Sequence, residues 1–265
     1  MPLPRITVVT PSYNQAAFLE QTLLSVLDQG YPDLEYLVLD GGSTDGSVEL
    51  IRRHGSRLSF WRSEKDGGQA AAIGEGFARA TGEVLAWLNS DDYYQPGALL
   101  AVGEAFARAP ATDLVYGTMR HVSADGRRLF DAHMVLDWRI LAWESEFVGQ
   151  PAMFWRRGLY QRAGGVDPAF RFAMDFDLLV RMLRAGARPA KLRQVLACFR
   201  EHAASKTTTL GEVARDEVAR VRAREGWSGG ALPALLARRW ALRGWRFARD
   251  PRCVASAIEQ RIHRG

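Results

Sequence analysis

The sequence predicts an α/β fold, in which helices cover both faces of a doubly wound, mostly parallel sheet and a helical extension follows at the C-terminus. Three observations predict it. Short apolar segments, of the length of buried strands, recur through residues 1–118. Segments with apolar residues at helical spacing separate them. The alternation of the two patterns is typical of βαβ units and a parallel sheet.

The expected elements follow in order from the N-terminus. Strands are expected at residues 6–10, 35–40, 58–62, 83–88 and 113–116, and helices at residues 16–29, 47–54, 69–80 and 96–107. The first strand is apolar and β-branched, as a buried parallel strand should be. Gly82 closes the third helix, and Pro96 stands where a first helical turn tolerates proline.

Beyond residue 118 the alternation loosens. Asp125 and Gly126 form a hairpin signal. Residues 174–185 return to helical spacing, and residues 195–200 have a strand-like pattern. The three threonines at 207–209 are interpreted as a hinge into the extension. Residues 125–150 give the least readable pattern of the chain.

Composition and charge exclude several classes of protein. Hydrophobic residues make up 47% of the chain and charged residues 25%, which is ordinary for a soluble globular protein. The net charge of +5 is concentrated in residues 231–265, where eight arginines stand against two acids. The remaining residues sum to −1, so the basic charge is no argument for nucleic acid as a partner.

The sequence also predicts a compartment. Its two cysteines, Cys198 and Cys253, form no CxxC and no metal-ligand spacing, which favours a reducing environment. No apolar run approaches the roughly 20 residues that span a bilayer. The first residues run directly into a strand pattern and leave no room for a signal peptide. We expect a cytoplasmic protein that is at most peripheral on the inner face of the membrane.

Three polar stretches follow predicted strands: TPSYN, DGGSTDG and NSDDYY. Ligands of open parallel sheets bind beyond the carboxyl ends of the strands, so these stretches should meet at one edge. Tyr13 offers a ring for a nucleotide base, and Asp40 can accept a hydrogen bond from a base or a ribose hydroxyl. Gly41 and Gly42 allow the backbone to approach a ligand closely.

Asp91 and Asp92 are adjacent acids at the end of an apolar strand. Their oxygens suit Mg²⁺ or Mn²⁺, which bind proteins through one or two carboxylates plus substrate phosphates. Such a cation relieves the repulsion between the two carboxylates. The alternative is structural: these acids can cap helices or begin turns, and Tyr13 can be a packing residue. Their co-location favours function, because caps need not cluster.

At these motifs the sequence resembles a known family. The resemblance, to the family 2 glycosyltransferases with the GT-A fold, rests on VVTPSYNQAAFLEQTLLSVLDQGYPDLEYLVLDGGSTDGS, then EKDGGQAAAIGEGFARATGEVLAWLNSDD, then GGVDPAFRFAMDFDLLVRMLRAG. It implies inverting transfer of a sugar from a nucleotide-diphosphate donor, most often a UDP-sugar, with Mn²⁺ or Mg²⁺. The acceptor would be a saccharide or a lipid-linked molecule, in cell-surface polysaccharide or glycolipid synthesis.

The resemblance also assigns roles to residues of this chain. Residues that would bind the nucleotide or the donor are Pro11, Tyr13, Asp40, Asp66, Gln69 and Asp91. Asp92 matches the metal-binding acid and Asp175 the catalytic base. His202, in an R-x-H-x-x-S pattern, would complete the metal shell or hold the diphosphate, and Lys206 is a weaker candidate for the same phosphates.

The resemblance covers residues 4–206 and divides the chain. Residues 1–206 would be the GT-A catalytic domain, with a nucleotide-binding half at 1–118 and an acceptor half at 119–206; residues 207–265 would be a basic helical extension. Departures from the family pattern are Gly41 for a second acid, Gly74 for an asparagine, Asn89 for the first acid of Asp-x-Asp and Met174 for a glutamate. A branch of the family also has the Gly41-Gly42 pair.

Inversion needs a base that removes the proton of the acceptor hydroxyl, for which Asp175 is the candidate. Asp177 lies about 200° further round an ideal helix, so the two acids should not both face the cleft. The alternative for either is an acid favoured at a helix start.

Other functions were weighed against transfer. An aspartyl phosphatase would need a second acid where Gly42 stands, and the chain has no GxxxxGK[ST] phosphate loop. A non-catalytic nucleotide-sugar binder remains the serious alternative.

The tail has an amphipathic pattern. Apolar residues fall on one stripe and arginines on a neighbouring one: Leu236, Trp240 and Phe247, and Arg239, Arg243 and Arg246. Two interpretations stay open. The helix packs on the catalytic domain with its arginines solvated, or it attaches the protein to a membrane surface.

Overall fold

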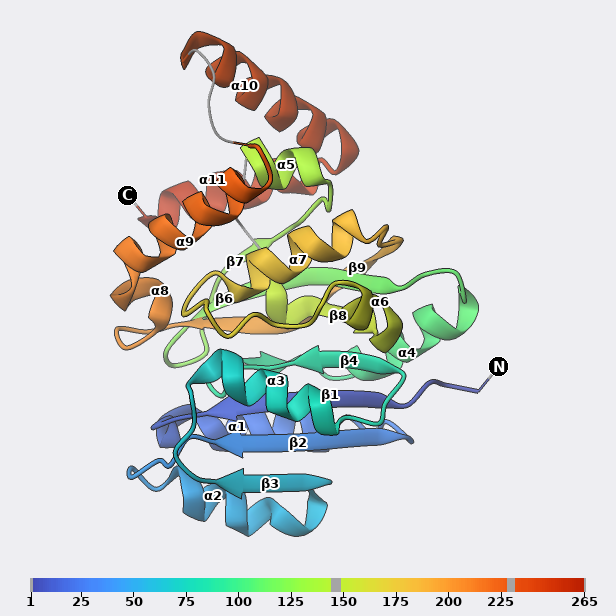
Figure 1. Ribbon diagram of the computed structural model, residues 1–265, viewed down its shortest axis with the longest axis vertical. Helices are drawn as coiled ribbons and strands as arrows, with labels where there is room; N and C mark the ends of the chain where they lie inside the picture. Colours follow the sequence, from blue (N-terminus) through green and yellow to red (C-terminus); the bar gives the residue numbers. More distant parts are fainter. Residues whose placement is uncertain (1, 144–148, 228–231, 265) are drawn as a thin grey trace.

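A single sheet organises the part of the chain that the computed structural model describes, which is residues 2–143, 149–227 and 232–264. Within those ranges nine strands join in the order β3-β2-β1-β4-β8-β6-β9-β5, and β7 pairs with β6. Figure 1 shows the strands stacked along the long axis of the molecule, with helices on both faces. The expected α/β architecture is confirmed.

The first half of the chain follows the expected alternation closely. Its elements are β1 (Ile6–Ser12), α1 (Ala16–Leu27), β2 (Leu34–Asp40), α2 (Ser47–His54), a 3₁₀ turn (Gly55–Arg57), β3 (Phe60–Ser63), α3 (Gln69–Arg79), β4 (Val84–Trp87), β5 (Tyr93–Tyr94) and α4 (Ala98–Arg108). The helix expected from residue 96 begins two residues later, because Gly97 adopts a left-handed conformation with φ of 76° and precedes the first helical residue.

The second half contains longer strands and more helices. Its elements are β6 (Leu114–Ser123), β7 (Arg128–Ala132), α5 (Trp138–Trp143), a 3₁₀ turn (Gln150–Ala152), β8 (Met153–Arg156), α6 (Arg157–Arg162), α7 (Met174–Arg184), β9 (Pro189–Glu201), α8 (Lys206–Thr209), α9 (Gly211–Arg224), α10 (Leu232–Arg249) and α11 (Arg252–Arg264). The Asp125-Gly126 hairpin signal is confirmed, since β6 and β7 pair antiparallel around it. Residues 207–209, expected as a hinge, end the short helix α8.

The sheet is parallel where the sequence alternates most regularly. β3, β2, β1 and β4 are all parallel, as expected. β8 then enters antiparallel to both β4 and β6, so that the second half of the sheet is mixed. The carboxyl ends of β1, β2 and β4 therefore lie at one edge, and the loops that follow them carry the three polar stretches.

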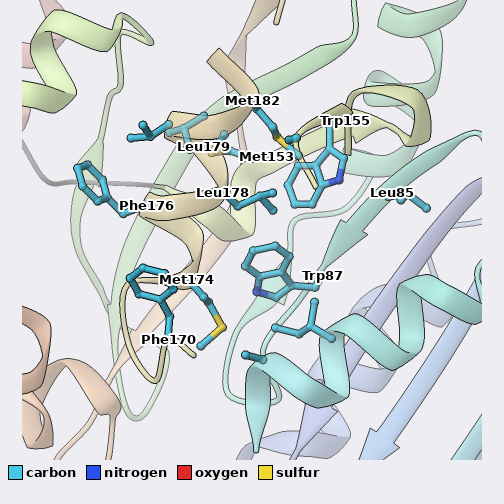
Figure 2. Packing of buried hydrophobic residues seen from close by; sticks show 14 of the residues in the cluster. Leu85, Trp87, Met153, Trp155, Phe170, Met174, Phe176, Leu178, Leu179 and Met182 are labelled. Atoms are coloured by element: carbon cyan, nitrogen blue, oxygen red, sulfur yellow. The ribbon is translucent and has the colours of Figure 1, made fainter. Parts of the chain in front are cut away.

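Two apolar layers hold the helices against the sheet. Helices α1, α2 and α4 pack on one face through a core that includes Leu23, Ile51 and Phe106. On the other face α3, α6, α7 and α9 share a second core. Figure 2 shows part of that second core, in which Leu178 and Met174 of α7 lie near Trp87 of β4. The two indole rings of Trp87 and Trp155 meet edge to face at 5.4 Å.

The C-terminal extension divides into two parts. Val218 and Val221 of α9 are buried in the second core, so α9 is packed against the same face of the sheet as α3, α6 and α7. α11 contacts β7, and α10 contacts α5 and α11 at the top of the molecule (Figure 1). No helix in the described residues is long and apolar enough to cross a membrane.

Close packing of α3 on the sheet requires a glycine. A Cβ on Gly76 would lie 2.5 Å from Cγ1 of Val9 and 3.1 Å from Cδ1 of Leu39. We expect Gly76→Ala to lower the free energy of unfolding by about 1–3 kcal/mol, because overpacking outweighs the gain in helix propensity. Denaturant unfolding checks this.

Gly74 of the same helix provides the control, since a Cβ added there would have no neighbour within 4 Å. Gly74→Ala should raise stability by about 0.5–1 kcal/mol. Equal stability changes in the two variants would contradict the packing argument.

Candidate active site

A cavity of about 720 Å³ opens where the three polar stretches meet. Its lining includes six of the nine site residues predicted from the sequence: Pro11, Tyr13, Asp66, Gln69, Asp91 and Asp175. The other three, Asp40, Asp92 and His202, do not line it. The expected convergence of the three polar stretches on one site is therefore confirmed. The predicted site residues themselves lie either in the cavity lining or behind it.

The mouth of the cavity carries an exposed aromatic ring. Tyr13 is 63% exposed, which is unusual for a tyrosine beside a buried strand. Gly41 explains how it fits, because a Cβ there would lie 3.3 Å from both Cδ2 of Tyr13 and Oδ1 of Asp66. The absence of a side chain at residue 41 lets the ring and the carboxylate approach each other across the β2 loop.

Asp40 is fully buried and lies behind the cavity wall. Its Oδ2 accepts hydrogen bonds from the backbone N–H of Ser43 at 2.8 Å and from Oγ of Ser63 at 2.7 Å. The N–H of Gly42 and Oγ of Ser43 donate to the same carboxylate at 3.1 and 2.5 Å. These bonds shape the loop after β2. The carboxylate of Asp40, expected to contact a base or a ribose, does not line the cavity.

The adjacent acids Asp91 and Asp92 point in opposite directions. Asp91 lines the cavity, whereas Asp92 is only 1% exposed and faces the interior. Oδ1 of Asp92 accepts a hydrogen bond from the backbone N–H of Arg200 at 3.0 Å. Burial, together with the charge of Asp91, raises the pKa of Asp92 well above its usual range. Asp91 therefore faces the cavity, whereas Asp92, the acid expected to bind the metal, does not line it.

His202 stands directly behind Asp91. Its Nε2 lies 3.0 Å from Oδ2 of Asp91, the ring is tilted against Phe18 at 4.6 Å, and the side chain is 7% exposed. The described residues hold no cluster of three or more His, Cys, Asp or Glu side chains that could bind a metal. One carboxylate with one imidazole fits a cation that takes its remaining ligands from substrate phosphates and water.

Arg200 and Thr22 hold the acidic loop in place. Arg200 is 3% exposed, and its Nε donates to the carbonyl of Asp91 at 2.9 Å. Its guanidinium also lies 4.8 Å from the ring centre of Phe18. Oγ1 of Thr22 on α1 donates to the carbonyl of Asp92 at 2.6 Å. In the sequence Arg200 is visible only as the first residue of the R-x-H-x-x-S pattern around His202, because a buried arginine has no signature in a single sequence.

Asp175 is the second residue of α7 and lines the cavity. Burial raises the pKa of Asp175 to about 6, although a hydrogen bond from the N–H of Phe176 and the charge of Lys206 act in the opposite direction. Asp177 is fully buried on the other side of the helix, where Arg181 and Arg224 bind it at 2.9 and 2.6 Å. The expectation that the two acids face different ways is confirmed.

A row of polar side chains joins the two sides of the cavity. Nζ of Lys206 donates to Oε1 of Gln69 at 2.5 Å, and Nε2 of Gln69 donates to Oδ1 of Asn89 at 2.7 Å. Burial lowers the pKa of Lys206, and the neighbouring Arg171 lowers it further, although the carboxylates of Glu217, Asp91 and Asp175 act in the opposite direction. The ammonium group of Lys206 thus interacts with the charges of both Asp91 and Asp175. This position makes Lys206 a stronger candidate for binding phosphates than the sequence indicated.

The chain resembles proteins of known class. Residues 7–172 match the family described as Glycosyl transferase family 2. A "PGL/p-HBAD biosynthesis glycosyltransferase" of Mycobacterium bovis is 31% identical over 188 residues, which cover 68% of this chain and 70% of that protein.

Solved structures share the fold. The TarS fragment of S. aureus in complex with UDP-GlcNAc has a TM-score of 0.62 at 19% identity, covering 82% of this chain and 66% of that chain. The mannosyltransferase PcManGT of Pyrobaculum calidifontis, in complex with GDP-Man and Mn²⁺, has a TM-score of 0.65 at 22% identity and covers 97% and 76%. These likenesses show that the fold is of the GT-A type.

Proposed function

Because this chain belongs to glycosyl transferase family 2 and is therefore a glycosyltransferase, we propose that it moves a sugar, with inversion, from a nucleotide-diphosphate donor to an acceptor hydroxyl. The observation that carries the proposal is a cavity that holds both a carboxylate paired with His202, Asp91, and a carboxylate with a raised pKa, Asp175. The first suits a diphosphate and the second suits proton removal.

The donor would lie along the strand-end side of the cavity. Tyr13 presents its ring for stacking on the base, and Pro11 and Asp66 border the same region. Asp40 acts indirectly by fixing the glycine loop that the nucleotide approaches. Gln69 lies between Asn89 and Lys206, next to the expected position of the diphosphate. A UDP-sugar is our preferred donor class.

Asp91 and His202 would hold a divalent cation, Mn²⁺ or Mg²⁺, and Asp92 would act by fixing the loop from inside. Bound there, the cation would neutralise charge that develops on the leaving diphosphate. Lys206 would add a second positive charge near the same group. The Mn²⁺ that accompanies GDP-Man in the structure of PcManGT supports this use of a metal.

Asp175 would act as the general base for the acceptor. A carboxylate is most effective as a base when its pKa is close to the operating pH, because it is then ionised and still able to hold a proton. The burial that raises the pKa of Asp175 to about 6 brings it toward that range. The acceptor would be a saccharide or a lipid-linked molecule in glycolipid or cell-surface polysaccharide synthesis, and the name of the Mycobacterium bovis relative supports a biosynthetic role.

The C-terminal helices would dock on an anionic membrane surface. Trp240 of α10 is 67% exposed, and Ile258 and Ile262 of α11 are 55% and 75% exposed at a spacing of four residues. Both acids of this segment turn toward the domain: Asp250 binds Lys191, and Glu259 binds Arg128.

The exposed apolar side chains and the excess of arginines in this segment suit the interfacial region of such a bilayer. The side chain of Leu236 lies outside the described residues.

If Asp175 is the base, replacing Asp175 and replacing Asp177 should have different effects on kcat and on stability. Asp175→Asn should keep donor affinity and thermal stability but lower kcat at least about 10²-fold. Wild-type kcat should fall as the pH drops through about 6, where Asp175 becomes protonated, and the variant should lack this step.

Asp177→Asn serves as the comparison, because it removes a charge that binds Arg181 and Arg224 on the side of α7 away from the cavity. It should lower the Tm and reduce kcat per folded molecule much less than Asp175→Asn does. The reverse order of kcat values would show that the base is wrongly assigned. Donor binding without any turnover by the wild type, over a range of acceptors, would favour the non-catalytic binder.

The proposed cation site at Asp91 predicts that Asp91→Asn loses the Mn²⁺-dependent part of UDP affinity while the protein stays folded. Titration calorimetry with and without Mn²⁺ measures this. Asp92→Ala should instead lower the Tm, since the N–H of Arg200 loses its acceptor. If Asp91→Asn bound UDP and Mn²⁺ like the wild type, the cation site would lie elsewhere.

The docking proposal predicts that the full chain co-sediments with anionic vesicles and that high salt weakens this. The double variant Ile258→Asn and Ile262→Asn should bind at least about tenfold more weakly, because two aliphatic side chains no longer enter the interface. Leu100→Asn, at an apolar residue of α4 that is 44% exposed, is the control and should bind normally. Equal sedimentation of all three proteins would leave the tail as ordinary packing.

A further inference from the structure

Glu217 lies on α9, outside the cavity and more than 40 residues from the segment that it binds. Its side chain is buried, with 7% exposure for the residue. Oε1 accepts a hydrogen bond from the backbone N–H of Arg171 at 2.8 Å. Oε2 accepts two more, from the N–H groups of Phe172 at 2.9 Å and Ala173 at 2.8 Å. One carboxylate therefore binds three consecutive backbone donors.

Those donors belong to the entry of α7, whose first residue is Met174. N–H groups at a helix start have no partner within the helix, and the residue before this helix, Ala173, has no side chain that could cap it. A carboxylate at this position also meets the positive end of the helix dipole. Glu217 thus supplies, from another helix, the cap that the local sequence lacks.

The electrostatics of Glu217 agree with this role. Burial alone would raise the pKa of the carboxyl, but the three N–H groups and the charge of Arg220 hold it below its usual range. The group is therefore ionised throughout the neutral range, where its charge and its three bonds act together. A neutral side chain of the same size would keep the volume but lose part of the attraction.

The capped segment is a wall of the cavity. Phe172, Met174 and Asp175 all line it, and Asp175 follows Ala173 by two residues. A second contact from the same helix fixes the other side of α7, where Arg224 binds the buried Asp177 at 2.6 Å. α9 therefore holds the first turn of α7 at two points, one on the backbone and one on a side chain.

We infer that Glu217 is a positioning residue for the reaction: it fixes the first turn of α7, so that Asp175 meets the acceptor hydroxyl in a reactive geometry. The inference rests on the proposed role of Asp175 as the base. It makes α9 of the C-terminal extension a part of the active-site framework. A displacement of about 1 Å at a reacting group can cost roughly 10²-fold in rate, so a cap of this kind has a measurable kinetic effect.

The test compares Glu217→Gln with two variants of the same helix. Glutamine keeps one acceptor oxygen, so the protein should remain folded. We expect kcat to fall about 10- to 100-fold and the Kd for UDP and Mn²⁺ to change much less, because the three hydrogen bonds of Glu217 go to the segment before α7 and not to Tyr13, Asp91 or His202. The pH at which kcat falls should move below about 6, since a looser helix start admits water to Asp175 beside Lys206.

Val218→Ala is the stability control. Val218 is buried next to Glu217, and its truncation removes packing but none of the three hydrogen bonds. It should lower the Tm at least as much as Glu217→Gln while keeping kcat per folded molecule and the pH profile of the wild type. Glu212→Gln, at an exposed glutamate of α9, should change neither.

The outcomes separate the two hypotheses. If Glu217→Gln keeps the wild-type kcat and pH profile while Asp175→Asn loses turnover, the positioning role is wrong and the base assignment stands. If Val218→Ala lowers kcat as strongly as Glu217→Gln, general loosening explains the effect and the inference fails. If Asp175→Asn retains full turnover, the proposed base itself is wrong, whatever Glu217→Gln shows.

Discussion

The arrangement of the cavity depends on how two adjacent carboxylates avoid each other. Asp91 and Asp92 cannot both be ionised side by side in a site shielded from water without a large cost. The chain turns Asp92 inward, where it accepts the N–H of Arg200, and leaves Asp91 in the cavity. Because Arg200 belongs to β9, this bond ties the loop after β4 to the second half of the sheet. It also places His202, two residues further on, behind Asp91.

Helix α7 is central to the second half of the molecule, and α9 of the C-terminal extension binds it. The sequence placed a boundary at residue 206, yet Glu217 and Arg224 of α9 bind the start of α7 and its buried acid. Val218 and Val221 lie in the same core as Trp87, which ends the strand before the acidic loop. The cavity thus has two supports: β9 behind Asp91 and α9 beside Asp175.

Periodicity and chain order predicted most of the fold, because apolar spacing reports directly which face of an element is buried. They also predicted that the three polar stretches meet at one edge of the sheet. They could not say which of Asp91 and Asp92 faces inward, since that depends on the path of a loop whose partner, Arg200, is 108 residues away. Nor could they find Glu217: its helix is rich in charges of both signs, a pattern typical of a solvated surface.

The exposed ring of Tyr13 is held by the same kind of long-range bonding. Asn14, which follows it, has φ of 51°, a left-handed conformation that asparagine tolerates better than most residues. Its N–H donates to Oγ of Ser43 at 2.8 Å, and its side-chain oxygen accepts the N–H of Thr44 at 2.9 Å. The β1 and β2 loops are therefore joined next to the ring. The backbone that carries the ring is therefore held before any ligand binds, which lowers the entropic cost of the base stacking proposed above.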